Sequence, residues 1–248
     1  MNAYLAEFVG TAILILFGNG VVANVLLAKS KGQNGGWIVI AVGWGFAVTC
    51  AVYAVGRISG AHINPAVSVS LASIGAFEWA RVPGYIAAQI AGGFTGSVLV
   101  YLTYYAHWRE TENPDLKLAC HSTAPAVRKF GPAFMTEVIG TAMLIFGILA
   151  FGKIGLDGDT NADAWTAAVG TWFGPFLVGM LVLGIGLSLG GPTGYAINPA
   201  RDLGPRIAHA VLPIHGKGSS DWAYAWVPIV APLIGGVIGA QLFLLLGF

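Results

Sequence analysis

The 248 residues are 56% hydrophobic and only 9% charged, and their mean hydropathy is +0.74. Soluble domains carry about 25% charged residues, so this composition excludes a soluble globular enzyme and a disordered chain. Twelve Lys and Arg against eleven Asp and Glu give a net charge of +1, which offers no basic surface to nucleic acid. The sequence is therefore that of a polytopic membrane protein, and Cys50 and Cys120 do not make a disulfide framework.

Apolar runs long enough to cross a bilayer occur six times along the chain. A bilayer core about 30 Å thick needs about 20 apolar residues at about 1.5 Å each. The runs cover 4–28, 37–56, 82–106, 132–152, 166–189 and 223–248. Their length and glycine content favour helices over barrel strands. The first run lacks a charged start and a cleavage site, so we expect a retained helix and not a signal peptide.

The stretches between the runs carry additional information. Residues 59–74 and 193–208 are each half a span long, so neither can cross alone and both are predicted to be re-entrant. Residues 107–131 carry much of the charge and predict a polar linker, and 153–163 predict a short acidic loop. The aromatic residues that end the third run are expected to form an interfacial belt. They are Tyr101, Tyr104, Tyr105 and Trp108.

The chain contains an internal repeat. AEFVGTA at 6–12 recurs as TEVIGTA at 136–142, and SGAHINPA at 59–66 recurs as TGYAINPA at 193–200. A third match, in the same order, pairs Gly92 and Gly96 with Gly235 and Gly239. These glycines predict close helix packing inside the subunit, with a dimerisation face as the alternative.

The order of the matches defines an inverted repeat. Each half holds three spans and one half-span, and an odd number of spans makes the second half enter from the opposite face. We expect a first repeat over 1–106, a connecting loop over 107–131 and a second repeat over 132–248. Together they form one transmembrane domain over 1–248, with an all-α fold of six transmembrane helices and two re-entrant half-helices.

An Asn-Pro-Ala tripeptide lies in each re-entrant segment. Asn is a favoured N-cap and Pro is favoured at the first helical position, so each tripeptide predicts the start of a short helix. One copy alone would indicate an ordinary helix cap, but two copies at corresponding positions indicate a site at the membrane midplane. The tripeptides are Asn64, Pro65 and Ala66, and Asn198, Pro199 and Ala200.

Two half-helices that meet at their N-termini would each present about half a positive charge, which repels cations. The non-helical residues before each tripeptide would expose backbone carbonyls to a wet cavity. These residues are Gly60, Ala61, His62 and Ile63, and Gly194, Tyr195, Ala196 and Ile197. A row of acceptors that ends in two amide donors is typical of a path for neutral, hydrogen-bonding solutes.

The duplicated tripeptide in this setting resembles that of the major intrinsic proteins, the aquaporin and aquaglyceroporin family, over essentially the whole chain. The resemblance implies a channel and not an enzyme, without cofactor or metal. It also implies a homotetramer with one pore per subunit in the cell membrane, with both termini cytoplasmic. Loop charges disagree with that orientation, because three cationic residues would lie inside and seven outside.

The same resemblance places a selectivity filter on Trp44, Gly186, Tyr195 and Arg201. Trp44 lies eighteen residues before His62, as in glycerol facilitators. Gly186 stands where water-selective channels typically have His, and is expected to leave room in the pore. Asp at position 202 is also similar to the glycerol branch of the family, since water channels commonly have Ser at this position. The departure is Tyr195, where glycerol facilitators usually have Phe, so its hydroxyl is expected to narrow or polarise the filter.

These features predict a passive channel for glycerol and other small uncharged solutes, with water, that excludes ions and protons. A water-selective pore is the alternative, disfavoured by Gly186 and Asp202. Glycerol, dihydroxyacetone, urea and protonated lactic acid all remain candidates. A proton-coupled transporter that uses Glu7 or Glu137 is a third hypothesis. An intramembrane enzyme is disfavoured because no nucleophile, base and orienting group occur together.

The remaining polar residues are assigned structural roles. In the family, glutamates at the positions of Glu7 and Glu137 accept hydrogen bonds from the re-entrant loops, and Asp202 is expected to orient the second half-helix. His62 is predicted to be a hydrogen-bonded structural residue, with a pH gate as the alternative. The other histidines, His107, His121, His209 and His215, are expected in loops and lack metal-ligand spacing.

Overall fold

The structure, a computed structural model, describes residues 1–152 and 162–247, with backbone alone over 162–171. All secondary structure in these residues is helical, and six of the helices are long and apolar enough to cross a membrane. The prediction of an all-α membrane fold is therefore confirmed. The six are α1 (Ala3–Leu26), α2 (Trp37–Ser59), α4 (Val82–Thr103), α7 (Phe130–Phe151), α8 (Ala162–Leu189) and α10 (Trp226–Leu245). Residues 153–161 of the predicted acidic loop lie outside the described residues.

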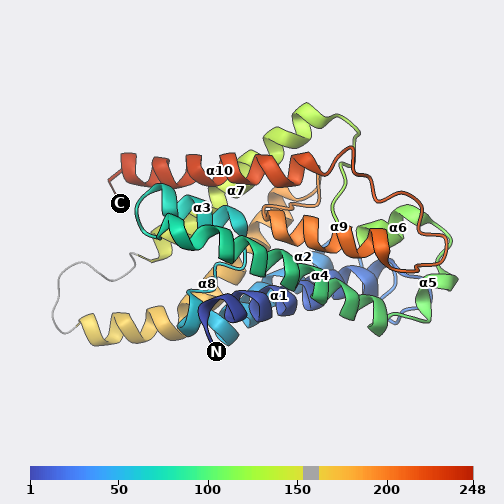
Figure 1. Cartoon of the computed structure of the whole chain (residues 1–248), viewed down its shortest axis with the longest axis horizontal. Helices are drawn as coiled ribbons and strands as arrows, with labels where there is room; N and C mark the ends of the chain where they lie inside the picture. The colour runs from blue at the N-terminus through green and yellow to red at the C-terminus, as the bar shows by residue number, and fades with distance from the viewer. Residues whose placement is uncertain (153–161, 248) are drawn as a thin grey trace.

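Two shorter helices, α3 (Pro65–Ser73) and α9 (Pro199–Val211), occupy the predicted re-entrant segments. Each begins with Pro directly after an Asn N-cap, as the tripeptides predict. Figure 1 shows α3 and α9 one after the other along the long axis of the bundle, and both pack against α4 and α10. The two half-helices therefore lie inside the bundle, and each extends over only part of its length.

The repeated glycines bring two pairs of helices into close contact. α4 packs on α1, where a Cβ atom at Gly92 would lie 2.3 Å from the carbonyl oxygen of Phe8. α10 packs on α7 in the same way, where a Cβ at Gly235 would lie 2.3 Å from the carbonyl oxygen of Val138. The prediction that these glycines pack helices inside the subunit is confirmed.

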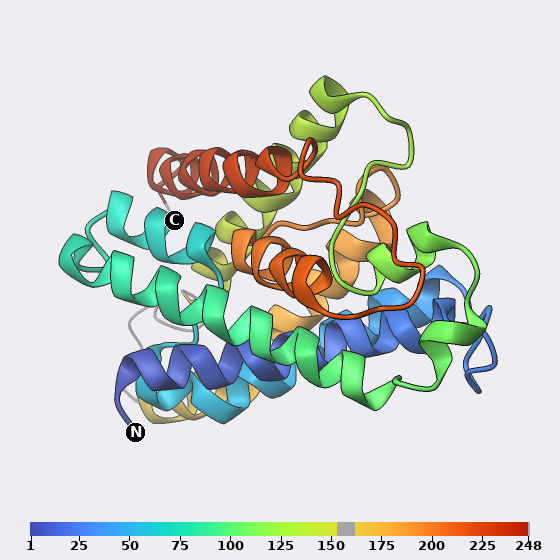
Figure 2. The ribbon, with the colours of Figure 1, turned by 45° about the vertical axis from the view of Figure 1, so that its right-hand side comes forward.

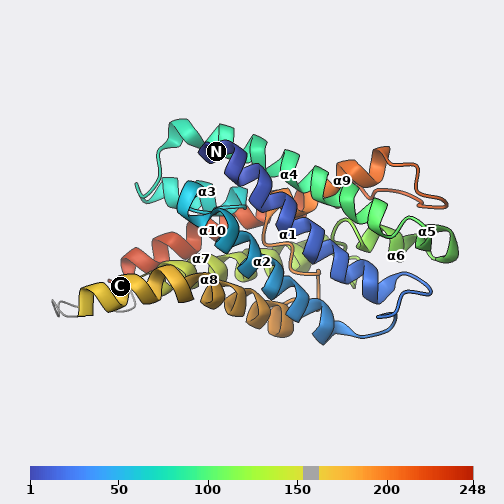
Figure 3. The same cartoon turned by 90° about the horizontal axis from the view of Figure 1, so that it is seen from below.

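The two ends of the bundle differ in what covers them. Both chain termini lie at one end, which we call the terminal end, and the short helix η1 (Trp79–Arg81) leads into α4 there. The predicted polar linker lies at the opposite end, the linker end, and forms two short helices, α5 (His107–Glu110) and α6 (Pro114–Ala119) (Figures 2 and 3). The linker thus covers only one mouth of the bundle.

The predicted aromatic belt is wrong for two of its four residues. Trp108 is 2% exposed and Tyr101 is 7% exposed, whereas Tyr105 is 64% exposed. The Trp108 ring stacks on the imidazole of His121 at 5.4 Å, and its Nε1 donates to the Tyr101 carbonyl at 2.9 Å. The linker folds back over the end of α4 and buries these rings, so they pack inside the protein instead of facing lipid.

Candidate functional site

The backbone before each half-helix takes the same unusual conformation. In the first segment φ is +85° at Gly60, +46° at Ala61 and +43° at Ile63. In the second segment the equivalent residues are also left-handed, with φ of +39° at Tyr195 and +42° at Ile197. Left-handed φ is unfavourable for bulky and β-branched residues, so the surrounding structure must hold these loops in place.

Glu7 of α1 holds the first loop. Its carboxylate is fully buried and accepts hydrogen bonds from the backbone N–H of His62 at 2.9 Å and of Ile63 at 2.6 Å. The Ser59 hydroxyl and the Gln89 amide also donate to it, at 2.6 and 2.8 Å. Both carboxylate oxygens are therefore occupied by donors of the protein itself, which offsets the loss of hydration.

Glu137 of α7 holds the second loop in the same way. It is fully buried and accepts from the backbone N–H of Ala196 at 2.9 Å and of Ile197 at 2.8 Å. Each glutamate thus fixes the loop of its own half of the chain. This arrangement supports the scaffold role proposed for the two carboxylates.

The two Asn caps meet and bind across the halves. Asn64 Nδ2 donates to the Ile197 carbonyl at 2.8 Å, and Asn198 Nδ2 donates to the Ile63 carbonyl at 2.9 Å. Each Asn Oδ1 accepts from the first turn of its own half-helix. Each Nδ2 donates one N–H across the halves, and its second N–H has no partner among the described residues. The N-termini of α3 and α9 therefore meet tip to tip.

A cavity of about 350 Å³ runs beside this junction. One wall is apolar and is made by α1, α2, α7 and α8 together with Val67 and Leu71 of α3. The other wall carries the predicted carbonyl-exposing residues, except Gly194, which lies outside the lining. Its polar side chains are His62, Asn64, Asn198 and Arg201.

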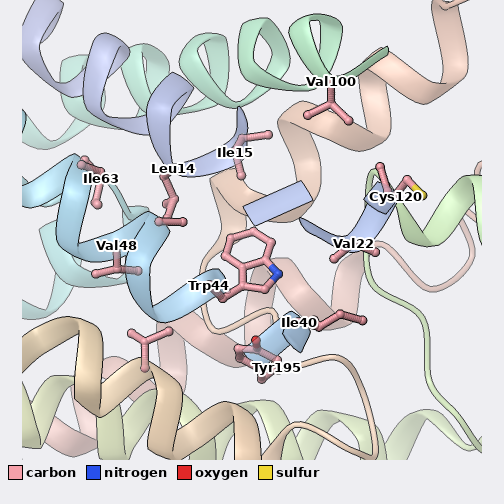
Figure 4. Close-up of a cluster of buried hydrophobic side chains, with 14 of the residues drawn as sticks. Leu14, Ile15, Val22, Ile40, Trp44, Val48, Ile63, Val100, Cys120 and Tyr195 are labelled. Atoms are coloured by element: carbon pink, nitrogen blue, oxygen red, sulfur yellow. The ribbon is translucent and has the colours of Figure 1, made fainter. Parts of the chain in front are cut away.

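Three of the four predicted filter residues lie together in this lining. The Arg201 guanidinium carbon lies 4.2 Å from the Trp44 ring centroid, and Tyr195 also lines the cavity. Figure 4 shows the Trp44 indole between Ile15 and Tyr195, with Leu14 and Val48 further along. The group joins two aromatic surfaces and one cation in a small space.

Gly186 does not line the cavity but lies behind the Tyr195 ring. A Cβ atom at Gly186 would lie 2.9 Å from Tyr195 Cζ, so the space expected for solute is filled by the tyrosine. Trp37 supports this arrangement, because its Nε1 donates to the Gly186 carbonyl at 2.9 Å and its ring meets Tyr195 edge-on at 5.8 Å. The Tyr195 hydroxyl is buried and has no hydrogen-bond partner among the described residues.

Asp202 binds an arginine and the linker rather than only its own half-helix. It accepts from Arg206 Nε at 2.8 Å, one turn along α9, and from the N–H and hydroxyl of Thr123 at 2.8 and 2.7 Å. Arg206 also donates to the carbonyls of Thr123 and Ser220. Sequence reasoning missed Arg206 and Thr123, although the four-residue spacing of Asp202 and Arg206 was a usable signal.

A buried histidine pair lies between the linker and α9. The rings of His121 and His209 are 5.3 Å apart, and their Nδ1 atoms bond to the hydroxyls of Ser97 and Ser220. The expectation that His209 lies in a loop is wrong, because α9 extends to Val211. Burial, with the nearby cations, lowers the pKa of His121 to about 3, so this side chain is neutral at physiological pH.

Residues 1–243 match the family described as major intrinsic protein, and the chain belongs to that family. It is similar to a probable glycerol uptake facilitator protein of Thermotoga maritima, at 60% identity over 98% of this chain and 98% of the relative. It is also similar to the glycerol uptake facilitator protein of Bacillus subtilis, at 51% identity over 98% of this chain and 84% of the relative.

Among solved structures, the X-ray structure of the aquaglyceroporin from Plasmodium falciparum matches with a TM-score of 0.82 at 32% identity. The match covers 97% of this chain and 94% of that one. The predicted family is thus confirmed by sequence and by fold, and with it the prediction that the chain is a membrane channel and not an enzyme.

Proposed function

We propose that the chain is a passive channel for glycerol and other small uncharged solutes, with water, that excludes ions and protons. The observation that carries this proposal is one continuous cavity bordered by Trp44, Tyr195 and Arg201 and by both Asn caps. The relatives named as glycerol uptake facilitators support the same solute class.

The lining suits a molecule with one carbon edge and one hydroxyl edge. Trp44 and Tyr195 offer apolar surface to the carbon edge, and the guanidinium of Arg201 can donate to two successive hydroxyls. The loop carbonyls then accept hydrogen bonds from the hydroxyl groups. Leaving a hydroxyl unpaired in an apolar passage costs about 2–7 kcal/mol, so these partners replace the lost water.

Cations meet two sources of positive potential in this passage. The N-termini of α3 and α9 point at the midplane, and Arg201 adds a full positive charge at the filter. A proton-coupled transporter is less well supported, because the oxygens of Glu7 and Glu137 accept from loop backbone N–H groups. A water-selective pore remains the alternative that the solute panel below tests.

We further propose a homotetramer in the cell membrane, with one pore per subunit and both termini cytoplasmic. The excess of cations in the linker-end loops is partly balanced by contacts there. Lys29 pairs with Glu110, and Arg128 pairs with Asp221 at 2.6 Å. Lys117 and Lys217 bind backbone carbonyls.

We propose the repeat boundaries 1–106 and 132–248, joined by 107–131, for the two halves of this single channel domain.

The filter is tested by solute flux into proteoliposomes, with glycerol, sorbitol, urea, dihydroxyacetone, lactic acid and water compared. Gly186→Ala places a methyl group 2.9 Å from Tyr195 Cζ and is expected to push that ring into the passage. Glycerol permeability should then fall more than water permeability. Gly184→Ala is the matched control, since a Cβ there meets no atom within 4 Å.

Parent protein that passes water but not glycerol would contradict the polyol proposal and favour the water-selective alternative. Equal losses of glycerol and water flux in Gly186→Ala would contradict the assigned filter. Accumulation of solute against its gradient would instead indicate coupled transport.

A further inference from the structure

Two adjacent residues of α1 touch two of the side chains that form the proposed filter. Gly18 lies against the Trp44 indole, and Asn19 lies against the Arg201 guanidinium. Neither residue lines the cavity. We infer that Gly18 and Asn19 are positioning residues that set the solute selectivity of the channel by fixing Trp44 and Arg201 from behind. This inference rests on the proposed function and adds to it two residues that act on the filter without lining the cavity.

Gly18 provides the space in which the Trp44 ring lies. A Cβ atom at Gly18 would lie 2.3 Å from Trp44 Cζ3 and 2.5 Å from two further ring carbons. Any side chain at this position must therefore move the indole. The indole is 4% exposed and has Arg201 on its face, so the direction left open to it is toward the passage.

Asn19 is a fully buried amide whose orientation is fixed by its partners. Its Nδ2 donates to the His121 carbonyl at 2.8 Å, so its Oδ1 is the atom that faces Arg201 Nη1, at 3.4 Å. The same Nη1 lies 3.5 Å from the His121 carbonyl. The Asn19 amide of α1 thus binds the linker through its Nδ2 and Arg201 through its Oδ1.

Arg201 depends on these two acceptors because, within the described residues, no carboxylate accepts a hydrogen bond from its guanidinium. The oxygens of the neighbouring Asp202 accept from Arg206 and Thr123. Within 1–152 and 162–247, the Arg201 guanidinium donates to Asn19 Oδ1 and to the His121 backbone carbonyl, at 3.4 and 3.5 Å. An arginine held this loosely keeps its other N–H groups available for solute, and a lost acceptor shifts it toward the passage.

The first experiment compares Asn19→Leu with Asn24→Leu in proteoliposomes. Leu has the same branching as Asn, although it is larger, and it removes the Arg201 contact. Asn24 lies on the same helix and accepts from Gly32 N, far from the filter, so it is the matched control. We expect Asn19→Leu to reduce glycerol permeability about five- to ten-fold and water permeability less than two-fold, because a lost hydrogen bond misplaces the guanidinium. Asn24→Leu should preserve the glycerol-to-water ratio.

The second experiment compares Gly18→Ala with Gly20→Ala. A Cβ at Gly20 meets no atom within 4 Å, so Gly20→Ala makes the same change two positions further along the same helix without a clash. Gly18→Ala is expected to lower the glycerol-to-water permeability ratio at least five-fold, and Gly20→Ala to leave it within two-fold.

A second variant keeps the Asn19 test available if Asn19→Leu does not fold. Asn19→Ala is smaller, is a better helix former and carries the same expectation.

Action through the arginine is tested by combining variants. In an Arg201→Leu background, Asn19→Leu should leave the glycerol-to-water ratio unchanged, because the group it positions is gone. A further change in that background, or an unchanged ratio in Asn19→Leu alone, would overturn the role of Asn19. Parent protein without glycerol permeation would instead overturn the proposed function, so the two failures are distinguishable.

Discussion

The two half-helices share one design at the centre and differ toward the ends. α3 and α9 both begin at an Asn-Pro, both follow left-handed loop residues, and both loops bind a buried glutamate of their own half. The Asn cross-bonds differ in length by only 0.1 Å, at 2.8 and 2.9 Å. The symmetric atoms are those that hold the backbone and present the two N-termini.

The differences between the halves lie in the side chains. At the repeat offset, Ala61 corresponds to Tyr195 and Val67 corresponds to Arg201. Ser68 likewise corresponds to Asp202, which binds Arg206 and the linker. Of the two re-entrant segments, only the second therefore places a tyrosine ring and an arginine side chain beside the passage. Repetition builds a two-fold frame, and two of the side chains in the proposed filter have no counterpart in the first re-entrant segment.

The largest effect is expected when Asp202 is changed to the residue of the first half. Asp202→Ser removes the partner of Arg206, and both side chains are fully buried. An uncompensated buried charge costs about 3–5 kcal/mol, so the unfolding midpoint in detergent should fall strongly. Ser68→Ala, the matched change in α3, removes weaker hydrogen bonds and should cost about 1 kcal/mol. Equal losses would show that the halves do not differ in this way.

A smaller loss tests the shared part of the frame. Glu7→Gln and Glu137→Gln each replace an acceptor oxygen by an N–H₂ group, so a loop N–H loses its partner. We expect each change to lower the free energy of unfolding by about 1–3 kcal/mol. Glu7→Gln should cost more, because Ser59 and Gln89 both donate to Glu7 besides the loop N–H groups, whereas Thr193 is the corresponding side-chain donor to Glu137 among the described residues. Chemical denaturation at pH 7 measures both, and an unaffected variant would contradict the symmetric lock.

The pH dependence tests the linker, which covers one end of the bundle and contacts both halves. The pKa of His121 is about 3 in the folded chain, below its ordinary 6.5. Below pH 6.5 the unfolded chain takes up a proton that the folded chain does not, so stability falls as the pH decreases toward 3. This group contributes up to about 1.4 kcal/mol per pH unit. His121→Phe should flatten this acid slope in thermal melts between pH 7 and 4; an unchanged slope would contradict the assignment.

The smallest effect is expected for the Tyr195 hydroxyl. Tyr195→Phe removes a buried group without a hydrogen-bond partner among the described residues, so stability should stay equal or rise by up to about 1 kcal/mol. Glycerol flux should change less than two-fold. A large fall in flux would show that the hydroxyl binds solute, which would make the second half more polar than its geometry indicates.

The frame could be predicted from the sequence, because its signals are local. Long apolar runs, two copies of Asn-Pro-Ala and paired glycines each specify an element without reference to a distant partner. Helix ends were less well determined. α9 continues to Val211, beyond the predicted half-span, and α2 continues to Ser59. The end of an apolar run does not mark where backbone hydrogen bonding stops.

The residues behind the filter could not be predicted. Asn19 is a single polar residue in an apolar run, and its partners His121 and Arg201 lie 102 and 182 positions away. Trp108 was assigned to the membrane interface because composition does not reveal that the linker folds back over it. Gly186 was expected to leave room in the pore, because the sequence does not reveal that the Tyr195 ring, from another segment, fills the space beside it.

The pairing of contacts within and between halves has a consequence for the order of assembly. Glu7 and Glu137 each bind a loop of their own half, so each re-entrant loop can take its shape as soon as its half has entered the membrane. The Asn bonds join different halves and can form only after the second has arrived. The junction between the two Asn caps therefore requires both halves to be in place.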